Sequence, residues 1–107
     1  MTVRLLAIGD VIGAAGCQML ADRMPTLKKR YHPDMILANG ENSAEGNGIT
    51  PHSADVLFSC GVDVITGGNH TFRRREVYDL LDQKTGVLRP YNYPDCPVGE
   101  GMTIWSN

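Results

Sequence analysis

The sequence has 107 residues, of which 42% are hydrophobic and 21% charged, a composition that indicates one globular domain and excludes a disordered chain. The formal net charge of -2 argues against a protein that holds nucleic acid mainly by bulk positive charge, so no stable nucleic-acid binding is expected. No apolar run approaches the ~18 residues of a membrane span, and the apolar stretch at residues 1–8 is too short for a secretory signal, so we expect a soluble cytoplasmic protein with no membrane contact.

Three short apolar runs predict strands. They cover residues 3–8, 35–38 and 62–66, and each stops at a glycine or at a polar residue beside one. The runs are rich in Val, Ile and Leu and do not alternate cleanly with polar residues, which is typical of strands buried on both faces of a parallel sheet.

Helical patterns fill the gaps between these runs. The first spans about residues 18–31, and Pro25 inside it is expected to kink or divide the helix. Thr50 and Pro51 are a helix start signal, with Thr50 as the N-cap. A third helix is predicted over residues 73–83. Strand and helix alternate every ~30 residues, which predicts an α/β fold of repeated βαβ units, with a mostly parallel sheet and helices on both faces.

The end of the chain departs from this pattern. A proline-rich loop over residues 89–97 is followed by residues 101–105, whose composition predicts one more strand. A strand at a terminus with no closing element indicates either the N-terminal part of a truncated domain or an edge that a partner covers. We therefore expect residues 1–107 to form a single domain that is part of a larger one.

Polar residues with ligand chemistry follow each predicted strand. Five of them lie at or just after a glycine that closes an apolar run: Asp10, Glu41, Asn42, Asn69 and His70. Each alone is more often a turn former or helix cap. The carboxyl ends of parallel strands lie along one edge of a sheet, however, and ligands bind there, so these side chains are expected to converge on one site.

Carboxylate, amide and imidazole groups together suit Mn²⁺, Fe²⁺ or Zn²⁺. The three cysteines, Cys17, Cys60 and Cys96, are widely spaced without a CxxC pair, which argues against structural zinc or disulfides. Two divalent ions bring +4 while Asp10 and Glu41 return only -2, so such a centre stays positive and attracts a phosphate and a hydroxide.

The same residue types suggest individual roles. Glu41, with two carboxylate oxygens, suits a bridging position between two ions, and His70 suits transition-state stabilisation or protonation of the leaving oxygen. A competing interpretation is a dinucleotide-binding fingerprint at residues 9–16. Val11 there would block close approach to a pyrophosphate and Asp10 would repel it, which weakens that interpretation.

Five motifs, in order and over essentially the whole chain, resemble the bacterial YmdB-like metallophosphoesterases of the calcineurin-like dimetal phosphoesterase superfamily. They occupy residues 9–13, 39–44, 46–50, 68–71 and 89–94. The resemblance implies half of a metallophosphoesterase-type α/β sandwich with a dinuclear centre. In it, Asp10, Glu41, Asn42 and Asn69 are ligands, Glu41 bridges, and His70 is catalytic near the phosphate.

The resemblance also implies a phosphodiesterase that hydrolyses cyclic nucleotides with a metal-bound hydroxide, in a homo-oligomeric cytoplasmic protein. Its two ions are expected to be iron or manganese, with zinc or magnesium as alternatives. Family members are longer, and their second half supplies further histidine ligands. This chain has only His32, His52 and His70, so alone it is expected to be weak or inactive.

A second departure is Phe72-Arg73 after the Asn-His-Thr motif, where family members often carry Trp-Asp, and Arg73, Arg74 and Arg75 together place positive charge near the site. Arg73 and Arg74 are candidates for holding a substrate phosphate, although such a run also suits a solvated face. The alternative function is a truncated, non-catalytic metal- or phosphate-binding module that acts through protein contacts.

Overall fold

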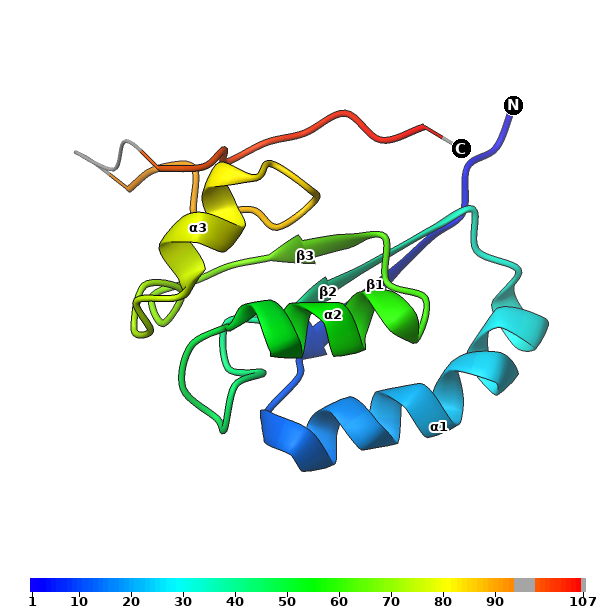
Figure 1. Ribbon diagram of the computed structural model, residues 1–107. Coiled ribbons are helices and arrows are strands. Elements are labelled where there is room, and N and C mark those ends of the chain that lie inside the picture. Colours follow the sequence, from blue (N-terminus) through cyan, green and yellow to red (C-terminus); the bar gives the residue numbers. More distant parts are fainter. Residues whose placement is uncertain (94–97, 107) are drawn as a thin grey trace.

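The computed structural model describes residues 1–93 and 98–106 (Figure 1). Its elements follow one another as β1 (Leu5–Asp10), α1 (Gly13–Tyr31), β2 (Met35–Asn39), α2 (Pro51–Ser59), β3 (Val64–Thr66) and α3 (Val77–Asp82). The strands form one parallel sheet in the order β1-β2-β3. The predicted α/β class with a parallel sheet is confirmed.

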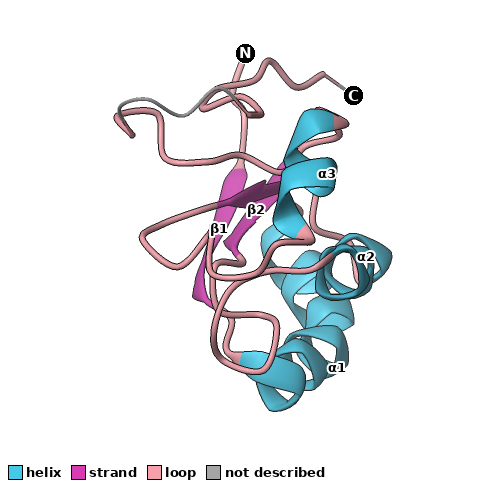
Figure 2. Ribbon diagram, turned by 60° about the vertical axis from the view of Figure 1, so that its left-hand side comes forward, coloured by secondary structure: helices cyan, strands magenta, loops and turns pink. Residues whose placement is uncertain are grey.

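The described helices pack on one face of the sheet (Figure 2). Leu20 of α1, Leu57 of α2 and Leu81 of α3 belong to a single buried core cluster with Ile36 and Ile65 of the sheet. The strands are added in sequence order, and right-handed crossovers that always step in the same direction place their helices on the same side. The expectation of helices on both faces is therefore not met by the described residues.

The opposite face of β1 carries apolar side chains into solvent. Leu5 is 56% exposed and Ala7 is also exposed, while the alternating residues Leu6 and Ile8 pack against the core. β1 pairs with β2 along one edge only, so its other edge is open in the described chain. This strand was predicted to be buried on both faces, and here it is covered on one.

Helix α1 begins earlier than predicted and is not divided. Its N-cap residue Ile12 has no side-chain cap, so the start at Gly13 leaves no signal in the sequence. The helix continues through Pro25 because Cys17, Leu20 and Met24 bury one side of it against the core. None of the described helices is both long and apolar enough to cross a membrane.

Helix α2 begins where the sequence places it. The Thr50 hydroxyl accepts a hydrogen bond from the Ser53 backbone N–H at 3.2 Å, and the Ser53 hydroxyl accepts one from the Thr50 N–H at 3.0 Å. This is a reciprocal capping box with Pro51 in the first turn. The capping prediction is confirmed.

We expect Thr50→Ala to lower the free energy of unfolding by about 1 kcal/mol, because it leaves the Ser53 N–H without its cap. Urea denaturation followed by circular dichroism would measure the change. Thr26→Ala, the same substitution at an exposed position inside α1, is the control and should be neutral or stabilising by up to about 0.7 kcal/mol, because alanine favours a helix more than threonine does. Equal midpoints for the two variants would contradict the capping role.

The last part of the chain differs from its prediction. Helix α3 starts at Val77 rather than at residue 73, because the preceding residues form turns in which Arg73 N–H donates to His70 O. Residues 101–106 form no strand, although Arg89 N–H donates to Glu100 O nearby. The predicted terminal strand is wrong for the described residues, because no neighbouring strand pairs with it.

Two of the three cysteines lie in the described part of the chain, and both are free. Burial raises the pKa of the Cys17 thiol, and the nearby Cys60 raises it further. Burial also raises the pKa of Cys60. Both are therefore protonated, weakly reactive thiols at neutral pH. Cys96 lies outside the described residues.

Candidate metal centre

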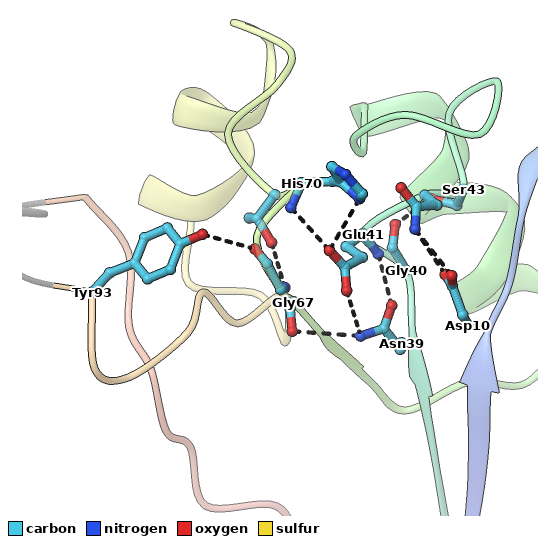
Figure 3. A network of polar contacts seen from close by, with 11 residues as sticks. Asp10, Asn39, Gly40, Glu41, Ser43, Gly67, His70 and Tyr93 are labelled. Atoms are coloured by element: carbon cyan, nitrogen blue, oxygen red, sulfur yellow. Dashed lines mark hydrogen bonds and ion pairs between the residues drawn. The ribbon is translucent and has the colours of Figure 1, made fainter.

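The predicted site residues lie at the carboxyl edge of the sheet, where Figure 3 shows Asp10, Glu41 and His70. Asp10 is the last residue of β1, Glu41 and Asn42 follow β2, and Asn69 and His70 follow β3. The three loops therefore face one another as parallel topology requires, and the contacts below join residues about 30 positions apart in the sequence.

Asp10 and Asn42 join the β1 and β2 loops. The Asn42 amide Nδ2 donates to both carboxylate oxygens of Asp10, at 3.2 and 3.0 Å. Asn42 is only 8% exposed, whereas Asp10 is exposed. One side of the Asp10 carboxylate is thus held by a buried amide while the group remains accessible at the sheet edge.

Glu41 and His70 join the β2 and β3 loops. The Glu41 Oε2 accepts a hydrogen bond from the His70 backbone N–H at 2.9 Å and lies 3.5 Å from His70 Nδ1. On the other side, Asn39 accepts from the Glu41 N–H at 3.2 Å and donates to Oε1 at 3.4 Å. The Glu41 carboxylate is therefore fixed from both ends, with its side chain 15% exposed.

The backbone of Gly68 packs directly against the Glu41 carboxylate. A Cβ atom built on Gly68 would overlap both oxygens of Glu41, so only glycine leaves room for the carboxylate there. The turn is held by Thr71, whose buried hydroxyl accepts from the Gly68 N–H at 2.8 Å, and by Tyr93, whose hydroxyl donates to Gly68 O at 3.4 Å (Figure 3). The observed position of the Glu41 carboxylate therefore requires glycine at position 68.

Two buried polar atoms in this cluster have no hydrogen-bond partner among the described residues, Asn42 Oδ1 and His70 Nδ1. The 3.5 Å approach of His70 Nδ1 to Glu41 is an ion pair only when the imidazole is protonated, and it is not a hydrogen bond. An unpaired buried polar group costs about 1–3 kcal/mol. Asn42 Oδ1 always carries lone pairs, and His70 Nδ1 carries one in the tautomer protonated at Nε2, so a cation bound beside them would remove this cost.

The cluster is an incomplete ligand set by itself. Within residues 1–93 and 98–106, no three His, Cys, Asp or Glu side chains come close enough together to hold a metal ion. Its charged donors are the carboxylates of Asp10 and Glu41, and the remaining donors are neutral amides, with Asn69 exposed on the same turn as His70. The donors are carboxylate and amide oxygens, which suit Mn²⁺, so they fit a divalent ion that takes further ligands from elsewhere.

The arginine run separates into one inward and two outward side chains. Arg74 donates from Nε to Asn47 O at 2.8 Å and from Nη2 to Ala44 O at 3.1 Å. Arg73 and Arg75 are exposed. The candidate phosphate ligands Arg73 and Arg74 thus lie in different surroundings, and Arg74 ties the β2–α2 loop to the β3–α3 loop.

Three features of the site were not predicted from the sequence. Asn39 orients Glu41 from both sides, Gly68 makes room for its carboxylate, and Arg74 holds the neighbouring loop. The Asn39-Gly40 pair after a strand is a signal for an Asx-type turn and points to Asn39. The roles of Gly68 and Arg74 depend on residues about 30 positions away and leave no local signal.

Comparison with known proteins places this geometry in a family. The family model described as YmdB-like protein matches residues 6–107. The chain belongs to the YmdB-like family. A relative from Bacillus subtilis strain 168, named 2′,3′-cyclic-nucleotide 2′-phosphodiesterase, is 41% identical over 101 residues, which are 94% of this chain and 38% of that protein. The family resemblance inferred from the five motifs is confirmed.

Two solved structures show the same fold in similar chains. A crystal structure of a hypothetical protein from Thermus thermophilus superposes with a TM-score of 0.83 at 40% identity and covers 92% of this chain. The structure of a phosphatase from Mycoplasma pneumoniae gives a TM-score of 0.89 at 28% identity over 100% of the chain. This chain covers 38% of the first and 40% of the second, so it spans about two fifths of the length of these relatives.

Proposed function

We propose that this chain is the N-terminal part of a metal-dependent phosphodiesterase that hydrolyses phosphodiester bonds of cyclic nucleotides at a dinuclear centre. The observation that carries the proposal is the pairing of Asp10 with Asn42 and of Glu41 with His70 at one sheet edge. The two unpartnered buried atoms of that cluster support it, as does the name of the Bacillus subtilis relative. The two similar solved structures also share the fold.

In this proposal Asp10, Glu41, Asn42 and Asn69 would hold two divalent ions, iron or manganese first and zinc or magnesium as alternatives. When bound, such ions supply Lewis acidity at the phosphoryl oxygens and lower the pKa of water. The chain itself contributes only two negative charges from Asp10 and Glu41, so the loaded site would remain positive and attract an anionic phosphodiester.

His70 is the proposed catalytic residue. Hydrolysis transfers a water oxygen to phosphorus, breaks one P–O ester bond and leaves an oxygen that takes up a proton. The His70 main chain is anchored on Glu41 through its N–H, which keeps the imidazole on the same turn as Asn69 and about a third exposed, at 33%. That placement lets the side chain reach both the site and solvent, as a proton donor requires.

The proposed site is a partial one. Because the described residues hold no cluster of three charged or imidazole ligands, we propose that the chain alone is weak or inactive and that further ligands come from more chain or from a second copy in a homo-oligomer. The open edge of β1 and the exposed Leu5 favour the second candidate function, a non-catalytic metal- or phosphate-binding module that acts through protein contacts.

The test is metal binding followed by turnover. After reconstitution with Mn²⁺, we expect the wild-type chain to retain metal, Asp10→Ala to lose most of it, and His70→Ala to retain metal but lose hydrolysis of 2′,3′-cyclic AMP. Asp22→Ala and His52→Ala, exposed positions on α1 and α2, are matched controls and should behave as wild type. Because the chain alone is proposed to have weak activity at most, turnover is assayed at high enzyme concentration. Weak hydrolysis that His70→Ala abolishes supports the phosphodiesterase, metal retention without any turnover favours the binding module, and equal metal content in wild type and Asp10→Ala contradicts both.

A further inference from the structure

A pocket of about 650 Å³ lies directly after the turn that carries Asn69 and His70. Its lining comes from one short stretch of chain and consists of Phe72, Arg73, Arg75, Tyr78 and Asp79. The pocket is an open concavity rather than an enclosed cavity, since Arg73, Arg75, Tyr78 and Asp79 are all exposed. None of these residues contributes to the Asp10–Asn42 or Glu41–His70 pairs.

The aromatic part of the pocket is tied to the metal centre. The Phe72 ring stacks with Tyr93 at a centroid distance of 5.7 Å and meets Tyr78 at 5.6 Å. Tyr93 in turn donates to Gly68 O, beneath the Glu41 carboxylate (Figure 3). Tyr78 is the outermost of these three aromatic residues and is 43% exposed, so part of its ring remains accessible to a ligand.

The charged part of the pocket is unpaired. Among the residues that the structure describes, neither Arg73 nor Arg75 lies within ion-pair distance of a carboxylate, whereas Arg74 pairs with Glu45 at 3.5 Å. Two free guanidinium groups are suited to phosphate oxygens, which they bind bidentately. Asp79 adds an acceptor that suits the N–H groups of a nucleobase.

The pocket also lies close to His70 along the chain. The Arg73 N–H donates to His70 O at 3.0 Å, which closes a turn, and the ends of such a turn lie within about 7 Å of each other. A phosphodiester at the metal centre carries a nucleoside on one side of the phosphate. The pocket is the described cavity whose aromatic and cationic lining begins one turn from His70.

We infer that Phe72, Arg73, Arg75, Tyr78 and Asp79 form a nucleotide-binding subsite, in which the base stacks on the Tyr78 ring and the arginines hold a phosphate. Stacking on aromatic side chains and cation–π contact with arginine are tolerant of base identity. The inference rests on the proposed phosphodiesterase function for the position of the reacting phosphate. It adds to that function the residues of this chain that hold the nucleoside beside the reacting phosphate.

The experiment compares two probes, 5′-AMP and inorganic phosphate, whose binding to the 107-residue chain in EDTA is followed by NMR titration or calorimetry. We expect wild type to bind 5′-AMP at least about tenfold more tightly than phosphate, since stacking on one aromatic residue is worth that much. Tyr78→Ala should bring the ratio of the two affinities close to one, and Tyr78→Phe should restore it. Arg73→Ala and Arg75→Ala should weaken both probes and reduce the salt dependence of binding.

Tyr31→Ala is the matched control, because Tyr31 is 46% exposed at the end of α1, away from the pocket, and should leave both affinities unchanged. If Tyr78→Ala lowers the melting temperature, two other results test whether 5′-AMP binds in the pocket. These are weaker 5′-AMP binding in Arg75→Ala and chemical-shift changes at residues 72–79 when 5′-AMP is added. Equal affinity for the two probes, or 5′-AMP affinity unchanged in all three variants, overturns the inference.

Asp10→Ala separates this inference from the proposed function. The substitution should abolish Mn²⁺ retention and leave 5′-AMP binding in EDTA intact. Loss of Mn²⁺ together with Tyr78-dependent binding of 5′-AMP supports the subsite. Binding of 5′-AMP that is lost in Asp10→Ala but unaffected by Tyr78→Ala assigns the nucleotide to the sheet edge and overturns it.

Discussion

Gly68→Ala is expected to weaken Mn²⁺ binding by about 10–100-fold, the range typical of changes just outside a metal's ligands. A methyl group on Gly68 would occupy the space of the Glu41 carboxylate, so the carboxylate must leave the position in which the His70 N–H and Asn39 hold it. Gly68 does not have a left-handed backbone, so alanine fits there without backbone strain. The substitution therefore acts on the proposed ligand rather than on the turn.

The measurement is the affinity for Mn²⁺ by titration calorimetry, with the melting temperature of the metal-free chain recorded alongside. Gly9→Ala is the matched control, because a Cβ on Gly9 meets nothing within 4 Å although Gly9 is adjacent to Asp10. Glu41→Gln, which keeps the side-chain length and removes the charge, should lose affinity as well. Unchanged Mn²⁺ affinity in Gly68→Ala and Glu41→Gln would remove Glu41 from the ligand set.

The sequence predicted the elements that packing and topology determine together. The apolar runs before Asp10, Asn39 and Gly67 became parallel strands, and the polar residues after them lie at one edge because parallel strands all end there. The Thr50 cap was predictable because Thr50 and its partner Ser53 are only three residues apart. Prediction from sequence succeeded where the deciding residues are close together, as at the Thr50 cap, or where strands and helices alternate regularly along the chain.

Prediction failed where a distant contact decides the structure. The start of α1 at Gly13 depends on a bond from its N–H to Asn42 O, 29 positions along the chain. The composition of residues 101–105 favours a strand, but a strand forms only beside a partner, and the described residues offer it none. The three arginines look equivalent in sequence, yet within the part of the chain that the structure describes Arg74 alone donates to carbonyls of another loop.

The loop that Arg74 holds has an unusual backbone. Glu45, Gly46 and Gly48 all have positive φ angles, of 55°, 78° and 91°, and Glu45 is not a glycine. The loop closes on itself through the bonds from Ala44 N–H to Gly48 O and from Asn47 N–H to Ala44 O. Such a conformation persists only when surrounding contacts impose it, and the Arg74 guanidinium supplies the contacts from outside the loop.

We therefore expect Arg74→Ala to lower the free energy of unfolding by about 1–3 kcal/mol, since two hydrogen bonds from a charged donor are lost, one to the partly buried Ala44 carbonyl and one to the exposed Asn47 carbonyl. The ion pair to Glu45 contributes little of this, because the Glu45 side chain is 87% exposed. The larger effect is local. Amide hydrogen exchange in residues 44–48 should speed up more than exchange in the core of α2, because the loop opens without global unfolding.

The same opening should reach the metal centre. Asn42 lies two residues before the clamped loop and orients Asp10, so Arg74→Ala is expected to weaken Mn²⁺ binding in addition to loosening the loop. Arg74→Lys can replace at most part of the paired contact to Ala44 O and Asn47 O and should recover only part of the loss. Arg75→Ala, exposed and one residue further on, is the control for charge and should leave loop exchange unchanged. Loop exchange that is the same in Arg74→Ala and Arg75→Ala would show that the backbone bonds alone hold the loop, and Arg74 would then be free to bind a substrate phosphate.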